Sequence, residues 1–166
     1  MEANPESLTR NMVRDLWALG VNRLSLGVQS LDNGVLQVLG RIHDADCARQ
    51  AIRMAQERFE NISIDLMCGI PGQTMASFER DVHEAVALGV KHVSVYPLAI
   101  EEGTPFDAMV ARGELPEPDP DVQAEPDDAQ MPFISSMISI DSPSMNSKLK
   151  FTLFGSRMYR SPLSFA

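Results

Sequence analysis

Three apolar runs alternate along the chain with amphipathic helical patterns, and this order constrains the fold more than any other feature of the sequence. The runs are typical of buried strands and cover residues 22–28, 61–67 and 92–98. Helical patterns at residues 44–59 and 74–88 separate them. Strand–helix–strand order predicts parallel pairing with right-handed crossovers, so consecutive strands should lie side by side and begin to curve. We therefore expect an α/β fold, a partial parallel (β/α) barrel, with an open doubly wound sheet as the alternative.

Shorter helices are predicted at residues 8–19, 32–39 and 105–112. The first should bury one apolar face, which consists of Leu8, Met12, Val13, Leu16 and Trp17. Residues of types that commonly cap helices precede three of the predicted helices, at Asp32, Asp44 and Thr74. Residues 2–5 directly precede the first helix, as though the chain began at the carboxyl end of a strand. The pattern thus indicates a segment of a barrel.

The composition of the chain changes near residue 131. All but one of the 23 acidic residues come before residue 132, whereas nine serines fall in the last 35 residues. The stretch 114–131 is rich in proline and acidic residues, which favours a solvated linker. We therefore predict a partial (β/α) barrel over residues 1–113, an acidic Pro-rich linker over 114–131 and an atypical Ser/Met-rich tail over 132–166. The composition of this tail indicates non-native sequence, and no structure is predicted for it.

Charge and apolar content exclude several classes of partner. The net charge of −9 argues against nucleic acid and anionic membranes, since both bind basic surfaces. No run approaches the roughly 20 apolar residues of a membrane span and no leader pattern opens the chain, so a cytoplasmic protein is expected. Cys47 and Cys68 lack the spacing of a metal site and are expected to be buried, reduced thiols.

Polar residues stand at the predicted carboxyl ends of the strands, where parallel α/β folds bind ligands. They are Glu2, Gln29, Asp65 and the backbone around Ala99. Asp65 interrupts an apolar run, and an ionised carboxylate there must be paired or face a polar cavity. Gln29 has a second interpretation, because it could simply cap the helix that follows it.

Two basic residues follow the predicted helix 32–39. Arg41 and His43 could face a ligand, or they could simply stabilise the carboxyl terminus of that helix. Residues 69–74 lack the lysine and the glycine spacing of a phosphate loop, so a rigid turn is the better interpretation. His83 and His92 have no cysteine or second histidine at ligand spacing and are expected to be ordinary surface or core residues.

Five blocks of the chain closely resemble the haem-chaperone branch of the oxygen-independent coproporphyrinogen III oxidase-like radical SAM proteins. In order, they are Glu2–Pro5, Gly20–Ser30, Leu39–His43, Ile64–Thr74 and Ile100–Phe106. The resemblance implies a partial (β/α)₆ barrel that holds S-adenosylmethionine over a [4Fe–4S] cluster. It also implies a role in haem delivery or porphyrin-related radical chemistry, with haem as a further partner.

The resemblance carries over to individual site residues. It implies that S-adenosylmethionine contacts the side chains of Glu2, Gln29, Arg41 and Asp65, and the backbone of Ala99. Arginine suits this role because its planar guanidinium can hold a carboxylate with two parallel hydrogen bonds. A carboxylate such as Asp65 can accept hydrogen bonds from ribose hydroxyls or pair with an ammonium group.

The chain also departs from the family pattern. The family ligates its cluster with a Cys-x3-Cys-x2-Cys loop, and two cysteines cannot replace three. We therefore expect a truncated member that binds S-adenosylmethionine but neither assembles a cluster nor cleaves the ligand by itself. Two alternatives stay open, namely a non-catalytic module that binds its ligand or docks on a cluster-bearing partner, and an unstable remnant of a truncated gene.

Overall fold

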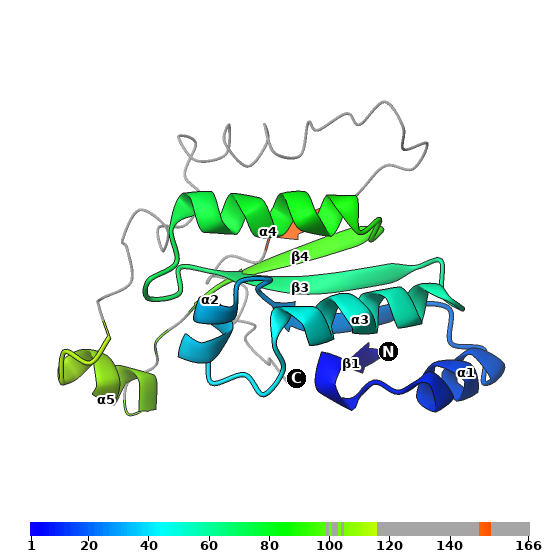
Figure 1. Cartoon of the computed structure of the whole chain (residues 1–166), viewed down its shortest axis with the longest axis horizontal. Helices are drawn as coiled ribbons and strands as arrows, with labels where there is room; N and C mark the ends of the chain where they lie inside the picture. Colours follow the sequence, from blue (N-terminus) through cyan, green and yellow to red (C-terminus); the bar gives the residue numbers. More distant parts are fainter. Residues whose placement is uncertain (99, 101–102, 104, 116–149, 154–166) are drawn as a thin grey trace, which may run out of the picture.

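Five parallel strands form one sheet in the order of the sequence (Figure 1). The computed structural model describes residues 1–98, 100, 103, 105–115 and 150–153. The strands are β1 (Glu2–Ala3), β2 (Leu24–Gln29), β3 (Ile62–Cys68), β4 (His92–Pro97) and β5 (Lys150–Leu153). A doubly wound sheet reverses its strand order at a switch point, whereas the order of these strands never reverses. The predicted partial barrel is therefore confirmed, as a sheet that does not close.

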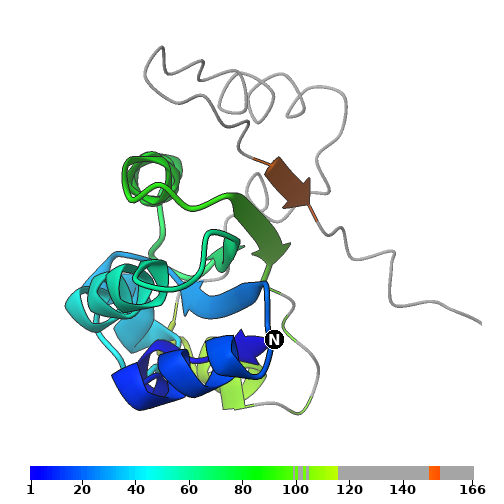
Figure 2. The same ribbon diagram turned by 90° about the vertical axis from the view of Figure 1, so that its right-hand side faces the viewer.

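Helices cover one face of this sheet. The helices of the chain are η1 (Pro5–Ser7), α1 (Arg10–Ala18), α2 (Asn33–Val38), α3 (Ala45–Gln56), α4 (Met75–Ala87) and α5 (Pro105–Ala111), of which α5 lies apart from the sheet (Figure 1). Figure 2 looks nearly along the strands and shows α1, α3 and α4 on the same side of the sheet. We call the opposite face of β1–β4 the open face.

Apolar and polar side chains alternate along the strands, so the two faces of the sheet differ in chemistry. In β2, Leu24, Leu26 and Val28 are fully buried against the helices, whereas the residues between them are half-buried on the open face. β3 and β4 continue this pattern, and Ile64 and Val93 join the same core. The helices supply the rest of it, and each buried aliphatic side chain contributes about 1.5–3 kcal/mol by leaving water. The core thus lies on the helical side, which leaves the open face free for polar groups.

The predicted helix starts are confirmed by side-chain caps. The Asp32 carboxylate accepts from the backbone N–H groups of Gly34 and Val35. Asp44 caps α3, and Thr74 caps α4 in a reciprocal capping box with Ser77. Because Asp32 caps α2, the alternative in which Gln29 caps that helix is wrong.

The predicted apolar face of the first helix is only partly buried. α1 begins at Arg10, after Leu8, and Val13 is its buried residue. Met12 and Trp17 are exposed, and the Trp17 ring lies 5.5 Å from the Arg58 guanidinium in a cation–π contact. This face is only partly buried because α1 lies at the margin of the sheet and packs against α3 along a single stripe.

The tail differs from the prediction at one place. The composition predicts no structure beyond residue 131, yet Lys150–Leu153 forms β5, which pairs in parallel with β4. A four-residue alternating segment gives a weak signal by itself, and the neighbouring edge of β4 supplies its hydrogen-bonding partners. The rest of the predicted tail and nearly all of the predicted linker lie outside the described residues. In the described part of the chain, no helix is both long and apolar enough to cross a membrane.

Candidate functional site

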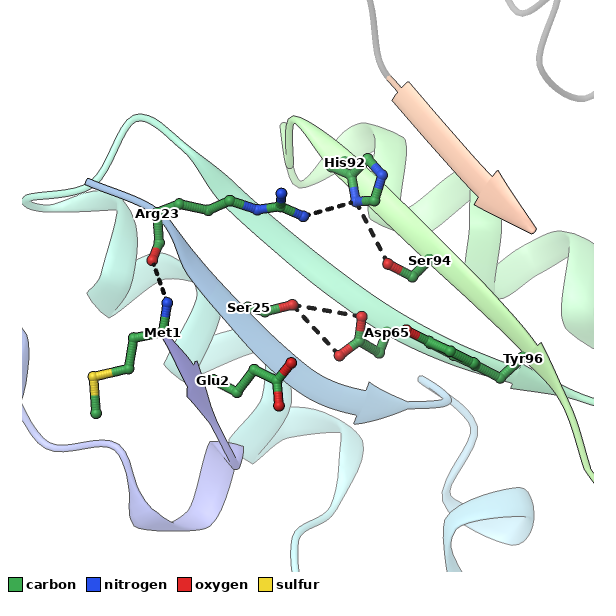
Figure 3. A pocket seen from close by; sticks show the side chains of 8 residues that line it. All are labelled: Met1, Glu2, Arg23, Ser25, Asp65, His92, Ser94 and Tyr96. Carbon is green, nitrogen blue, oxygen red and sulfur yellow. Dashed lines mark hydrogen bonds between the residues drawn. The ribbon is translucent and has the colours of Figure 1, made fainter. Parts of the chain in front are cut away.

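Polar side chains gather on the open face where β1–β4 lie side by side. Register brings them together, because Glu2 pairs with Ser25 and Asp65 pairs with Ser94. They line a pocket of about 440 Å³, whose walls are formed by Met1, Glu2, Arg23, Ser25, Asp65, His92, Ser94 and Tyr96. Figure 3 shows the Glu2 carboxylate on β1 and the Asp65 carboxylate on β3, with the Ser25 hydroxyl of β2 between them. Two of the predicted site residues therefore share one pocket.

Asp65 occupies the centre of this pocket and is half-buried. Burial raises the pKa of its carboxyl group, and the nearby charge of Glu2 raises the pKa further. Hydrogen bonds from Ser94 and Ser25 oppose this rise, although the Ser25 hydroxyl lies 3.4 and 3.5 Å from the two carboxylate oxygens. Within the described residues, Asp65 forms no ion pair with an arginine or lysine. A ligand that brings a positive charge or hydroxyl donors would therefore satisfy it.

A second group of polar atoms surrounds Gly27, two residues further along β2. The Arg41 Nη2 donates to the Gly27 carbonyl at 3.2 Å. A Cβ atom at Gly27 would lie 3.1 Å from the Asn4 Oδ1, 3.1 Å from the Gln29 Nε2 and 3.4 Å from the Arg41 Nη2. The missing side chain thus leaves a small space that three polar groups border.

The Arg41 guanidinium, whose Nη2 borders this space, also has a donor that is unpartnered within the described part of the chain. Its Nε is buried and has no hydrogen-bond partner among the described residues. An unsatisfied buried donor is costly, and a carboxylate is the acceptor that fits the planar edge of a guanidinium best. The side chain turns back to β2, where its hydrogen bond is to the Gly27 carbonyl.

The two groups form one continuous strip. Ser25 and Gly27 occupy alternate positions of β2, about 6–7 Å apart along the open face. The Gln29 amide lies beside Gly27. Glu2 and Asp65 flank the first of these positions, and Arg41 contacts the second. We call this arrangement the binding strip. Of the predicted site residues, only Ala99 lies outside the described residues.

Several pocket residues were not predicted from the sequence. His92 was expected to be an ordinary surface or core residue, but it lines the pocket, where its Nδ1 lies 2.8 Å from the Ser63 hydroxyl. Ser25, Ser94 and Tyr96 were not singled out. The signal was present, because each alternates with buried aliphatic residues and so shares the face of Asp65.

His43 lies elsewhere. It is buried, and its ring contacts the Val28 carbonyl and the Glu6 carboxylate instead of the end of α2. The predicted turn at residues 69–74 is confirmed, because the Gln73 side chain donates to the Met67 carbonyl and accepts from the Ile70 N–H.

The cysteines do not fit an iron–sulfur site. Cys47 lies on α3 and Cys68 ends β3, and both are free. Burial raises the pKa of the Cys68 thiol to about 11, which opposes the thiolate that a metal needs. The described residues contain no cluster of three His, Cys, Asp or Glu side chains suited to a metal. A [4Fe–4S] cluster is therefore not supported by this set of residues.

Filling the space at Gly27 should reduce ligand binding. We expect Gly27→Ala to weaken binding of S-adenosylmethionine, the ligand that the sequence resemblance implies, by about threefold to tenfold, because its methyl group displaces the polar tips by a few tenths of an ångström. Gly27→Val should weaken it more. Calorimetric titration measures the affinities, and equal affinity across the series would contradict a ligand at this position.

Comparisons with known proteins agree with the fold. A model of the radical SAM superfamily matches residues 1–85. The mitochondrial radical S-adenosyl methionine domain-containing protein 1 of Bos taurus is 43% identical over 126 residues, which are 75% of this chain and 28% of that protein. The heme chaperone HemW of Bacillus subtilis is 40% identical over 126 residues, which are 75% of this chain and 33% of HemW. The chain thus spans about a third of the length of these relatives.

Solved structures give the same result. The coproporphyrinogen III oxidase HemN from Escherichia coli, a radical SAM enzyme, has a TM-score of 0.62 at 26% identity and covers 82% of this chain and 31% of its own. The Elp3 protein of Methanocaldococcus infernus has a TM-score of 0.71 at 24% identity, over 92% of this chain and 34% of its own, and shows the fold alone. The family match over half of the sequence, the parallel sheet and these neighbours lead to one conclusion: the chain belongs to the radical SAM superfamily, with haem chaperones and coproporphyrinogen oxidase among its relatives.

Proposed function

We propose that this chain binds S-adenosylmethionine along the binding strip and carries part of the barrel of a protein related to the haem chaperones. The observation that carries the proposal is the Arg41 guanidinium, whose Nη2 borders the space at Gly27 and whose buried Nε has no partner among the described residues. Next to it lies a pocket with two carboxylates. S-adenosylmethionine has a carboxylate for the first group, and an ammonium group and ribose hydroxyls for the second.

Each residue of the strip has a role in this proposal. Arg41 holds the methionyl carboxylate with its guanidinium edge. Asp65 and Glu2 accept from the ribose hydroxyls or the ammonium group, and their charge favours a cationic ligand. The Gln29 amide both donates and accepts, so it fixes orientation. S-adenosylmethionine itself supplies a sulfonium centre that radical SAM proteins cleave by one-electron reduction.

Calorimetric titration of the full chain with S-adenosylmethionine tests the proposal. We expect saturable binding at one site, and weaker binding of S-adenosylhomocysteine, which lacks the positive sulfonium beside the two carboxylates. Absence of binding, or equal affinity for both nucleosides and for 5′-methylthioadenosine, which lacks the carboxylate and ammonium groups, would contradict it.

We further propose that the chain does not assemble an iron–sulfur cluster alone, because it has two cysteines where the family uses three. The electron for sulfonium cleavage would then come from a cluster-bearing partner or another segment. Anaerobic reconstitution followed by electron paramagnetic resonance should give no stable [4Fe–4S] signal. A stable signal that persists in a Cys47→Ala/Cys68→Ala chain would indicate adventitious iron, and one that this double variant abolishes would contradict the proposal.

A further inference from the structure

Gln29 adopts a backbone conformation that its side chain disfavours. Its φ is +67°, and it is the non-glycine residue with positive φ in the described part of the chain. The Ser30 N–H donates to the Val28 carbonyl at 2.9 Å, which closes a three-residue turn around Gln29. Register with β3 also changes here, since Leu26 pairs with Ile64 but Gln29 pairs with Leu66. Such strain persists only where the surroundings enforce it.

The Val28 carbonyl accepts a second hydrogen bond, from the His43 ring. The His43 Nε2 lies 3.1 Å from this oxygen and donates to it, because a carbonyl only accepts. The carboxylate beside the other ring nitrogen also only accepts, so both ring nitrogens carry a hydrogen when both bonds form. The other ring nitrogen, Nδ1, lies 2.9 Å from a carboxylate oxygen of Glu6, which fixes the orientation of the ring. The His43 side chain is completely buried. The buried His43 ring, with a hydrogen bond at each nitrogen, thus holds one side of the turn.

Buried polar groups also hold the residue after Gln29. The Ser30 hydroxyl donates to the Asp81 carboxylate at 2.6 Å and accepts from the Asp32 N–H at 3.1 Å. Ser30 and Asp81 are both buried between the sheet and α4. The position of Ser30 is therefore fixed, and the conformation of Gln29 depends on where the Val28 carbonyl points.

We infer that His43 is a positioning residue: its Nε2–H holds the Val28 carbonyl so that Gln29 keeps its positive φ and its amide points into the binding strip beside Gly27. This inference rests on the proposed function for the role of the amide in binding. Without the His43 donor, the turn relaxes to ordinary extended backbone. In a strand, a shift by one position turns a side chain to the opposite face. His43 is buried, so it acts through the turn.

The conformation of the turn can be tested without any ligand. Glycine adopts positive φ without strain, whereas in ordinary extended backbone it only loses more chain entropy on folding. In the parent chain, Gln29→Gly should therefore raise the melting temperature, by about 3 °C. In a His43→Met background the same change should lower it, by a similar amount. His43→Gln is the matched control, because glutamine has nearly the size of methionine but keeps an N–H donor, and there the rise should persist.

Binding provides the second measurement. His43→Met should weaken S-adenosylmethionine binding by about tenfold, with no further loss when Gln29→Gly is added, whereas His83→Met on the exposed face of α4 should change nothing. If the parent chain binds no S-adenosylmethionine, the proposed function fails while the melting temperatures still decide the inference. A rise with Gln29→Gly in the His43→Met background would overturn it. If His43→Met fails to fold while His43→Gln folds, the result supports the inference. If both variants fail to fold, the result overturns the inference.

Discussion

Arg41→Ala should weaken S-adenosylmethionine binding by about 100-fold. The variant removes a charge-assisted, two-donor contact to the methionyl carboxylate, which is worth about 1.5–3 kcal/mol per hydrogen bond. It also removes the hydrogen bond to the Gly27 carbonyl, so a loss of about 1 kcal/mol in the free energy of unfolding should accompany it. Calorimetric titration and chemical denaturation measure the two effects.

Two control variants separate charge from geometry at Arg41. Arg41→Lys keeps the positive charge but loses the planar pair of donors, so it should lie between the parent and Arg41→Ala. Arg80→Ala removes an exposed arginine from α4 and should leave affinity unchanged. If Arg41→Lys binds as tightly as the parent, the guanidinium does not hold the carboxylate in the proposed way.

Asp65→Asn should have opposite effects on binding and on stability. It removes a negative charge beside the proposed ribose and ammonium groups, so affinity should fall by at least about tenfold. The same substitution should raise the melting temperature near neutral pH, because the pKa of Asp65 is raised in the folded chain and its ionised form is therefore destabilising there. A ligand-binding group that costs stability is typical of functional sites.

The stabilising effect of Asp65→Asn should depend on pH in a defined direction. Burial raises the pKa of Asp65, so the folded chain binds this proton more tightly than the unfolded chain does. The resulting penalty is absent below the unfolded pKa of about 4 and grows as pH rises through the folded pKa. The gain from Asp65→Asn should therefore be largest at neutral pH and vanish under acidic conditions. A gain that does not change with pH, or one shared by the exposed control Glu60→Gln, would contradict this account.

The sequence predicts most of the fold because local signals and burial agree. The strand–helix order, the three helix caps and the parallel pairing all follow from local patterns that the tertiary structure retains. Prediction fails where contacts with distant parts of the chain determine the structure. Trp17 stays exposed on α1, and Lys150–Leu153 forms a strand by pairing with the edge of β4.

The candidate site could be predicted only in part. Asp65 stands out because a carboxylate interrupts an apolar run, whereas Ser25 and Ser94 give no such contrast. Spacing alone could not distinguish the roles of Arg41 and His43, because both follow the same helix. Their difference appears only in the structure, where the Arg41 side chain bonds to the Gly27 carbonyl and the His43 ring bonds to the Val28 carbonyl.

Titration of the ¹⁵N-labelled chain with S-adenosylmethionine, followed by amide chemical shifts, tests the binding strip most directly. The largest shift changes are expected at Ser25, Gly27 and Asp65 and at the Arg41 side chain, with small changes on the outer surfaces of α3 and α4. Changes confined to those helices, with none along the open face, would contradict a ligand site on the strip.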